Sequence, residues 1–144
     1  MANEDTIKLI KECNSGIKGA IASFDEVLKS VKSKELKQRI EDCKKAHEDW
    51  EDKTHNLLNQ YHYHDKEANL MVKMMSWIKI KMKLMQNKKD AQIAQFIVDG
   101  CNMRINSLYK YMKQYHEADQ ESHYIVEQLI ILEEHLMVDL RQYL

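Results

Sequence analysis

The sequence contains no proline and only three glycines in 144 residues. A sheet protein needs a turn residue every several positions, and proline and glycine are among the residues that most often supply turns. Their scarcity therefore favours a few long helices over a sheet fold. At this length the chain suits one domain, residues 1–144, with a single sizeable core.

The sequence also lacks an excess of charge and a long apolar run. Its 22 lysines and arginines nearly balance its 23 aspartates and glutamates, which argues against a nucleic-acid binder with a basic surface. Lysine interrupts every apolar stretch, so we expect no transmembrane segment. The first ten residues, MANEDTIKLI, lack the apolar core of a secretory signal, so we expect a cytoplasmic protein.

Cysteine is scarce, and its spacing indicates no paired site. Cys13, Cys43 and Cys101 are odd in number and far apart, and no CxxC motif exists. Structural zinc sites and dithiol redox motifs place cysteines in close pairs. We therefore expect reduced, partly buried thiols, with a redox role for one of them as the alternative.

Apolar residues recur with a helical period between Leu36 and Tyr61. Alternate steps of four and three residues predict a helix that packs along its length against other helices. Two members of the series are polar, His47 and Thr54. We interpret His47 as a hydrogen-bonded core histidine rather than a metal ligand. The series is Leu36, Ile40, Cys43, His47, Trp50, Thr54, Leu57 and Tyr61.

Similar patterns predict the other helices. Asn3 or Asp5 is expected to cap the first helix, Ser33 the second, and Asp90 the one that begins there. Gly16 and Gly19 lie inside the first pattern, which suggests a close approach between helices. The predicted helices are about residues 4–31, 34–62, 66–85, 90–116 and 122–144, with tight turns at residues 32–34 and 117–121.

The order of long and short connections predicts the topology. Each tight turn joins two long helices into an antiparallel hairpin. Residues 66–86 link the hairpins, and about twenty helical residues span about 30 Å, which can return the chain along the bundle. The predicted fold class is therefore all-α: a ferritin-like four-helix bundle of two antiparallel hairpins joined by a long helical crossover.

Several short motifs occur in an order that resembles a known family. The chain is similar, over nearly its whole length, to a bacterial ferritin-like four-helix-bundle family of unknown function, related to stress-associated ferritin-like proteins. The resemblance implies the same bundle and supplies no reaction. The motifs are Leu9-Ile10, Cys13 to Gly19, Glu35-Leu36-Lys37, Trp77-Ile78-Lys79, Asp90, Ile93, Gly100, Leu108-Tyr109, Leu136 and Asp139-Leu140-Arg141.

The sequence departs from the ligand set of a ferritin-like di-metal centre. Such a centre needs a glutamate from each of two helices and a Glu-x-x-His from each of the other two. Arg104 stands in the middle of its helix, where we expect it to pair with Glu133 or Glu134. We therefore predict no catalytic residue and no cofactor, and an enzyme is the less favoured interpretation. Iron or manganese is the alternative cofactor, with weak candidate ligands Glu51, His55, His62 and His64.

The methionine-rich crossover is the most unusual stretch. Methionine adapts to irregular grooves, so packing on the outside of the bundle is the plainer interpretation. The alternative is a surface for a partner or a membrane, because lysines and a tryptophan flank the methionines. The predicted function is non-enzymatic, through self-association or a protein partner; the alternative is a metal-binding ferritin-like oxidase or store with an irregular site. The predicted partner surface is Met71, Met74, Met75, Trp77, Ile78 and Met82.

Overall fold

The computed structural model describes residues 2–63, 68–85 and 88–144, with the side chains of the third helix described from Lys73 onward. This part of the chain is all-helical, which confirms the all-α prediction. Over the same ranges, no helix combines the length and the apolar content that a membrane crossing requires. The elements are α1 (Glu4–Leu28), α2 (Lys34–Gln60), α3 (Ala68–Leu84), α4 (Asp90–Gln114), α5 (Gln120–Leu140) and a 3-10 turn, η1 (Arg141–Tyr143).

Three helices begin at side chains that cap them. Asn3, Ser33 and Asp119 each accept a hydrogen bond from the backbone N–H three residues further on, which satisfies a donor that the helix itself leaves unpaired. The prediction that Ser33 begins the second helix is confirmed. Of the two caps considered for the first helix, Asn3 has this role, and Asp5 lies inside α1.

Asp90 does not cap its own helix, contrary to the prediction. The residue before α4 is Lys89, which makes no capping hydrogen bond through its side chain. The Asp90 carboxylate instead accepts hydrogen bonds from the backbone N–H groups of Lys32 (2.9 Å) and Ser33 (2.8 Å). The turn between α1 and α2 presents two donors, and Asp90 satisfies both. This contact ties the two hairpins together at one end.

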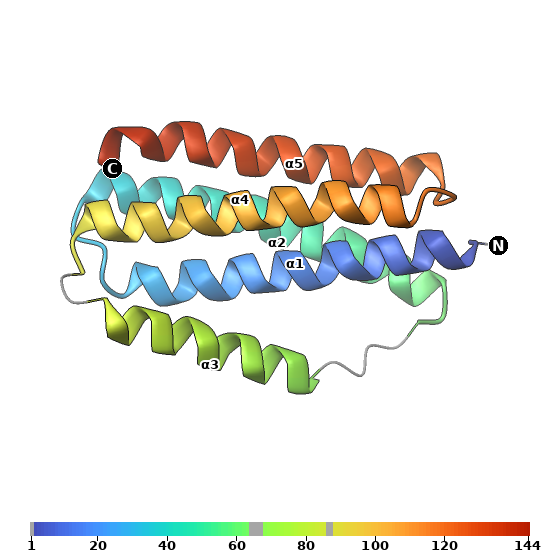
Figure 1. The fold of residues 1–144 in the computed structure, drawn as a ribbon, viewed down its shortest axis with the longest axis horizontal. Coiled ribbons are helices and arrows are strands. Elements are labelled where there is room, and N and C mark those ends of the chain that lie inside the picture. The colour runs from blue at the N-terminus through green and yellow to red at the C-terminus, as the bar shows by residue number, and fades with distance from the viewer. Residues whose placement is uncertain (1, 64–67, 86–87) are drawn as a thin grey trace.

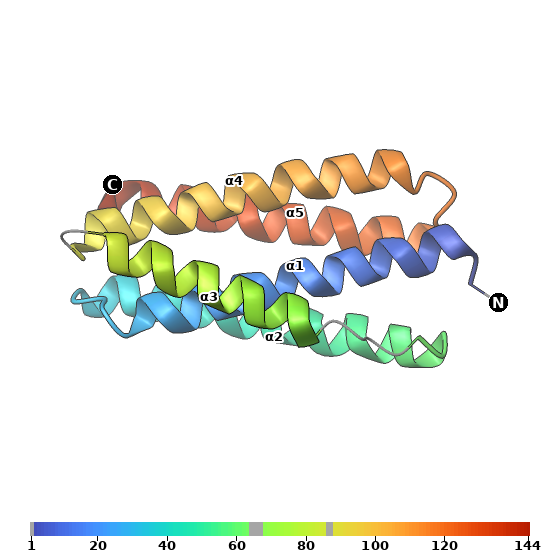
Figure 2. The same ribbon diagram turned by 60° about the horizontal axis from the view of Figure 1, so that its bottom comes forward.

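The helices form two antiparallel hairpins, α1 with α2 and α4 with α5, and α4 runs in the same direction as α2 (Figure 1). Between them α3 returns along the outside of the bundle, where it packs against α1 (Figures 1 and 2). Its bounds, Ala68–Leu84, fall inside the predicted crossover of residues 66–86. The arrangement leaves one long face of α3 without a neighbouring helix among the described residues.

The buried apolar side chains form two clusters, one towards each end of the bundle. The first joins the end of α1 to the start of α2, and Ile78 and Met82 of α3 belong to it. The second joins the start of α1 to the start of α5. Among the α3 side chains that the structure describes, from Lys73 onward, the buried apolar ones belong to the first cluster alone. Representative members are Phe24, Leu36, Ile40, Ile93 and Leu140 in the first, and Leu9, Ile10, Ile125 and Val126 in the second.

The two glycines of α1 have different surroundings. A Cβ atom added to Gly19 would lie 2.5 Å from the sulfur of Met74, so α3 approaches α1 closely at this position, as the sequence suggested. A Cβ atom added to Gly16 would meet nothing within 4 Å. No contact in the structure explains the glycine at position 16.

We predict opposite consequences of filling these two positions. Gly16→Ala should stabilise the protein by about 0.5–1 kcal/mol, because alanine favours the helix and meets no neighbour. Gly19→Ala gives the same gain in propensity but forces the Met74 side chain to move, so its net effect should be smaller or destabilising. Urea denaturation of both variants compares them directly. Equal stabilisation would contradict the close contact between α1 and α3.

Candidate functional site

A buried carboxylate lies at the middle of the bundle. The side chain of Glu133, on α5, is 4% exposed. Arg104, on α4, donates from Nε to its Oε1 (3.0 Å) and from Nη2 to its Oε2 (2.9 Å), the bidentate geometry of a strong ion pair. The ion pair expected between Arg104 and Glu133 or Glu134 is therefore confirmed at Glu133.

His47, on α2, is the second partner of this carboxylate. Its Nε2 lies 2.6 Å from Oε1 of Glu133, and its Nδ1 lies 2.8 Å from the backbone oxygen of Cys43. The Nε2–H group can donate to the carboxylate, and Nδ1 also lies 3.5 Å from Sγ of Cys43. The prediction of a hydrogen-bonded core histidine is confirmed. The cluster thus brings a guanidinium and an imidazole to one carboxylate.

The charge of Glu133 is maintained by these partners. Burial alone would raise the pKa of its carboxyl group, but the Arg104 guanidinium and the hydrogen bonds from His47 and Arg104 outweigh burial and lower the pKa from 4.5 to about 2. The pKa of Arg104 is affected in the reciprocal way: burial lowers it, and the attraction of Glu133 more than compensates. Both groups are charged at neutral pH.

The first helix completes the cluster through an aromatic ring. Phe24, on α1, meets the His47 ring edge-on at a centroid distance of 5.0 Å, and Arg104 Cζ lies 6.0 Å from the centroid of the same ring. Gly100 leaves room for the guanidinium, because a Cβ atom there would lie 3.1 Å from Nη1 of Arg104. Side chains from α1, α2, α4 and α5 therefore converge on one point.

This arrangement suits a structural ion cluster better than a metal centre. A metal ligand needs free lone pairs, but Glu133 already accepts hydrogen bonds from Arg104 and His47, and a metal ion would meet the positive guanidinium. Within the described ranges, no group of three or more His, Cys, Asp or Glu side chains has a geometry that could hold a metal ion. The cluster provides charge pairing in the core.

The neighbouring thiols are also poor nucleophiles. Cys43 and Cys101 are buried and not disulfide-bonded, as is Cys13. Burial, reinforced by the Glu133 charge and opposed by Arg104, raises the pKa of Cys43 to about 12 and also raises that of Cys101. Burial also raises the pKa of Cys13 to about 12. All three are therefore protonated thiols at neutral pH, and the thiolate is the reactive form.

The structure does not assemble a metal site from the weak metal candidates that it describes. Glu51 lies at the edge of a hollow between helices, and His55, one turn further along α2, is exposed. His62 is exposed beyond the end of α2, with a φ of 58°. His64 lies outside the described residues. Thr54, next to His55 on α2, is buried.

Thr54 forms a second, smaller polar contact in the core. It accepts a hydrogen bond from Nδ2 of Asn14 on α1 (2.9 Å) and donates its own proton to the backbone oxygen of Trp50 (2.9 Å). Asn14 and Thr54 are both buried, at 2% and 0% exposed. His47 and Thr54, the two polar members of the α2 series, thus both have hydrogen-bond partners on other helices and on α2 itself.

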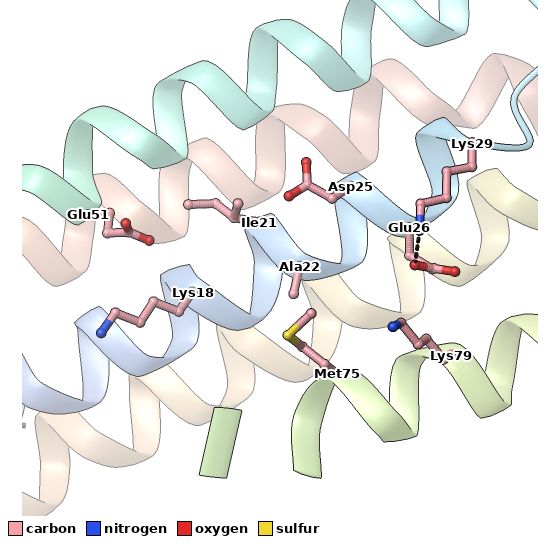
Figure 3. Close-up of a pocket in the computed structure, with 9 residues that line it drawn as sticks. All are labelled: Lys18, Ile21, Ala22, Asp25, Glu26, Lys29, Glu51, Met75 and Lys79. Atoms are coloured by element: carbon pink, nitrogen blue, oxygen red, sulfur yellow. Dashed lines mark hydrogen bonds and ion pairs between the residues drawn. The ribbon is translucent and has the colours of Figure 1, made fainter. Parts of the chain in front are cut away.

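An open hollow of about 480 Å³ lies between α1, α2 and α3 (Figure 3). Its carboxylates are largely paired with lysines: Asp25 with Lys44, and Glu26 with Lys29 at 3.0 Å. Met75 reaches from α3 towards Ala22 across the hollow (Figure 3). The mixture of charges and the open shape give it no evident ligand. The lining residues are Lys18, Ile21, Ala22, Asp25, Glu26, Lys29, Glu51, Met75 and Lys79.

The predicted partner surface on α3 is divided by the fold. Ile78 and Met82 are buried, each 3% exposed, and Met74 packs against the same core cluster, so these three do not form an exposed surface. Met75 and Trp77 are exposed, at 44% and 47%. The side chain of Met71 lies outside the described residues.

Two exposed apolar residues of α3 were missed by the sequence analysis. Ile80 is 56% exposed and Leu84 is 71% exposed, and both lie on the outer side of α3 with Trp77. The signal was present, because Trp77, Ile80 and Leu84 are spaced by three and four residues. The predicted partner surface was instead centred on the methionines of the opposite side.

Comparison with known proteins finds no family model, no curated protein and no solved structure that matches this chain.

Replacing the central carboxylate should have a large effect on stability. Glu133→Gln leaves Arg104 buried without its counter-charge and removes the charged hydrogen-bond acceptor of His47, so we expect a loss of about 3–5 kcal/mol at neutral pH. Glu134→Gln removes an exposed carboxylate at the adjacent position and should change little. Urea denaturation at neutral pH measures both values. Similar losses in the two variants would contradict a special role for Glu133.

Because the pKa of Glu133 is lowered in the folded protein, we predict that the protein loses stability in acid. The folded-state pKa of Glu133 is about 2 and its ordinary value is 4.5, so its contribution is complete above pH 4.5 and disappears as the pH falls towards 2. The difference corresponds to about 3 kcal/mol. Denaturation of the wild type at several pH values should show this decline, and Glu133→Gln should lack it. An identical acid slope in both proteins would contradict the assignment.

Proposed function

We propose that this chain is a non-enzymatic binding bundle of ferritin-like topology that acts through the outer face of α3. The direction of α4, parallel to α2 after a long helical connection, supports the topology, because one long crossover between two hairpins is the ferritin-like arrangement (Figure 1). Membership of the bacterial, stress-associated ferritin-like group rests on the motif order in the sequence.

One observation carries the binding function: α3 has apolar side chains on two opposite faces. Its inner face, with Ile78 and Met82, is used by the core. Its outer face exposes Trp77, Ile80 and Leu84, which packing of α3 on α1 does not require. Apolar residues gathered on an exposed face mark interaction sites more often than single exposed residues do. We call these three residues the outer strip of α3.

The metal-binding alternative has no comparable support. Arg104 holds the buried carboxylate that a metal would use, and the proposed function places no metal there. Protein purified from cells supplied with iron and manganese should therefore contain less than about a tenth of an equivalent of either metal per chain. Elemental analysis gives the answer, with Arg104→Met as a comparison. A full equivalent in the wild type would overturn the non-metal assignment.

Photo-crosslinking in cells tests binding through α3. We expect p-benzoyl-phenylalanine in place of Ile80 or Leu84 to form adducts, because this face meets a partner, and the same group in place of Tyr124 or Val138 on α5 to form few. All four positions are exposed, so the comparison controls for access to solvent. A crosslinked dimer would identify self-association. Adducts to protein and to lipid both count in this comparison. Equal adducts, or none of either kind, from the two helices would contradict the proposal.

A further inference from the structure

We infer that the outer strip of α3 binds the surface of an anionic phospholipid bilayer. This inference rests on the proposed function and specifies the partner. It is carried by three features of the described residues: the shape of the apolar strip, the lysines on either side of it, and the basic end of the bundle next to it.

The outer strip is narrow and lies on a convex surface. At about 100° per residue, Trp77, Ile80 and Leu84 fall within about 60° of one another around α3. The helix lies on the outside of the bundle, and no second helix borders this face among the described residues (Figure 2). A groove would suit an inserted helix or peptide, but a convex ridge with a tryptophan suits the flat interface of a bilayer.

Lysines flank this strip on both sides. By the same helical geometry, Lys81 lies about 40° beyond Trp77, and Lys83 lies about 60° from Ile80 on the other side. Lys73 follows the strip towards the start of α3 and is exposed. None of these three forms an ion pair with a described residue, although Lys81 lies 5.4 Å from the centroid of the Trp77 ring. Their charges are available to an external anion.

The charge of this stretch has one sign. Residues 68–89 contain six lysines and no aspartate or glutamate, in a chain whose overall charge is −1. Among these six lysines, Lys79 differs because it lines the first hollow together with the acidic residues Asp25 and Glu26 (Figure 3). We therefore assign the lipid-facing charge to the other five lysines. An interfacial helix with lysines beside a Trp/Leu face is the pattern of peripheral membrane binding.

The end of the bundle extends the basic surface. A second open hollow, with a volume of about 520 Å³, lies where the turn between α1 and α2 meets the residues before α4. Lys32, Lys88 and Lys89 line it and have no ion pair with a described residue, whereas Lys29 pairs with Glu26. Figures 1 and 2 show that α3 ends at this end of the bundle, so these lysines add positive charge near the end of α3.

The same features disfavour a protein partner. The cores of protein interfaces are depleted of lysine, whereas lysines here border the outer strip on both sides. A second copy docked strip to strip would bring two sets of unpaired lysines together. Like charges across an interface oppose association. An anionic bilayer instead offers charges of the opposite sign and an apolar layer within reach of Trp77.

Binding to lipid vesicles tests the inference. Full-length protein should sediment with phosphatidylcholine vesicles that contain phosphatidylglycerol, and not with phosphatidylcholine alone. In a Trp50→Phe background, the emission of Trp77 should shift to the blue on binding, and added salt should weaken binding. Absence of binding to the anionic vesicles, or equal binding to both kinds, would overturn the inference.

Matched surface variants locate the binding face. Replacing Trp77, Ile80 and Leu84 together by serine should weaken binding at least about tenfold. Lys81→Gln with Lys83→Gln should weaken it about 25-fold, because each lysine near an anionic surface contributes about fivefold. Serine at Tyr124, Ile131 and Val138 of α5, which are similarly exposed, should leave binding unchanged. An equal loss in the α5 variant would overturn the assignment to α3.

Circular dichroism and denaturation midpoints check that these variants fold, which we expect because every substituted side chain is exposed. Failure of the two proposals can be distinguished. Peptide adducts from position 80 without vesicle binding would overturn the lipid inference and support binding through α3. No adducts and no vesicle binding would overturn both.

Discussion

The carboxylate of Glu133 is the constraint on which the rest of the bundle depends. It is buried between the two apolar clusters, and it remains charged because Arg104 and His47 hold it from two other helices. Phe24 brings the fourth helix against the same groups. A slip of any of these helices by one turn would separate a buried charge from its partner. Apolar packing alone tolerates many arrangements, whereas these contacts are made only at the observed relative height of the helices.

The same cluster differs in kind from the di-metal centre expected of the ferritin-like bundle that we propose. A di-metal centre places several carboxylates around metal ions. Here one carboxylate is paired with the Arg104 guanidinium, which belongs to the chain, and accepts a hydrogen bond from His47. Gly100 makes room for this ion pair, since a larger side chain there would crowd the Arg104 guanidinium. This buried cluster therefore has a structural role, and the interaction that we propose takes place at the surface of the bundle.

Much of this fold follows from the sequence, because the apolar series and the capping residues indicate the same helices. The series through His47 and Thr54 placed α2 correctly, and Ser33 marked its start. Glu133 was also visible in principle, since it stands among the apolar residues of α5. The sequence also predicted the ion pair between Arg104 and Glu133 or its neighbour, but it did not predict the partners of His47 and Thr54 on other helices. Pairing depends on the relative height of helices that are far apart in the chain, as the unexpected contact of Asp90 with the first turn shows.

The crossover helix shows the limit of periodicity most clearly. A helix with one apolar face indicates which side is inside, but α3 has two such faces, and the sequence does not say which one packs. In the structure the face with Ile78 and Met82 packs into the core, and Met74 beside them lies close to Gly19 of α1. Trp77, Ile80 and Leu84 are therefore exposed, together with the lysines that flank them. The burial of one apolar face of α3 thus leaves the other as the surface that we assign to membrane binding.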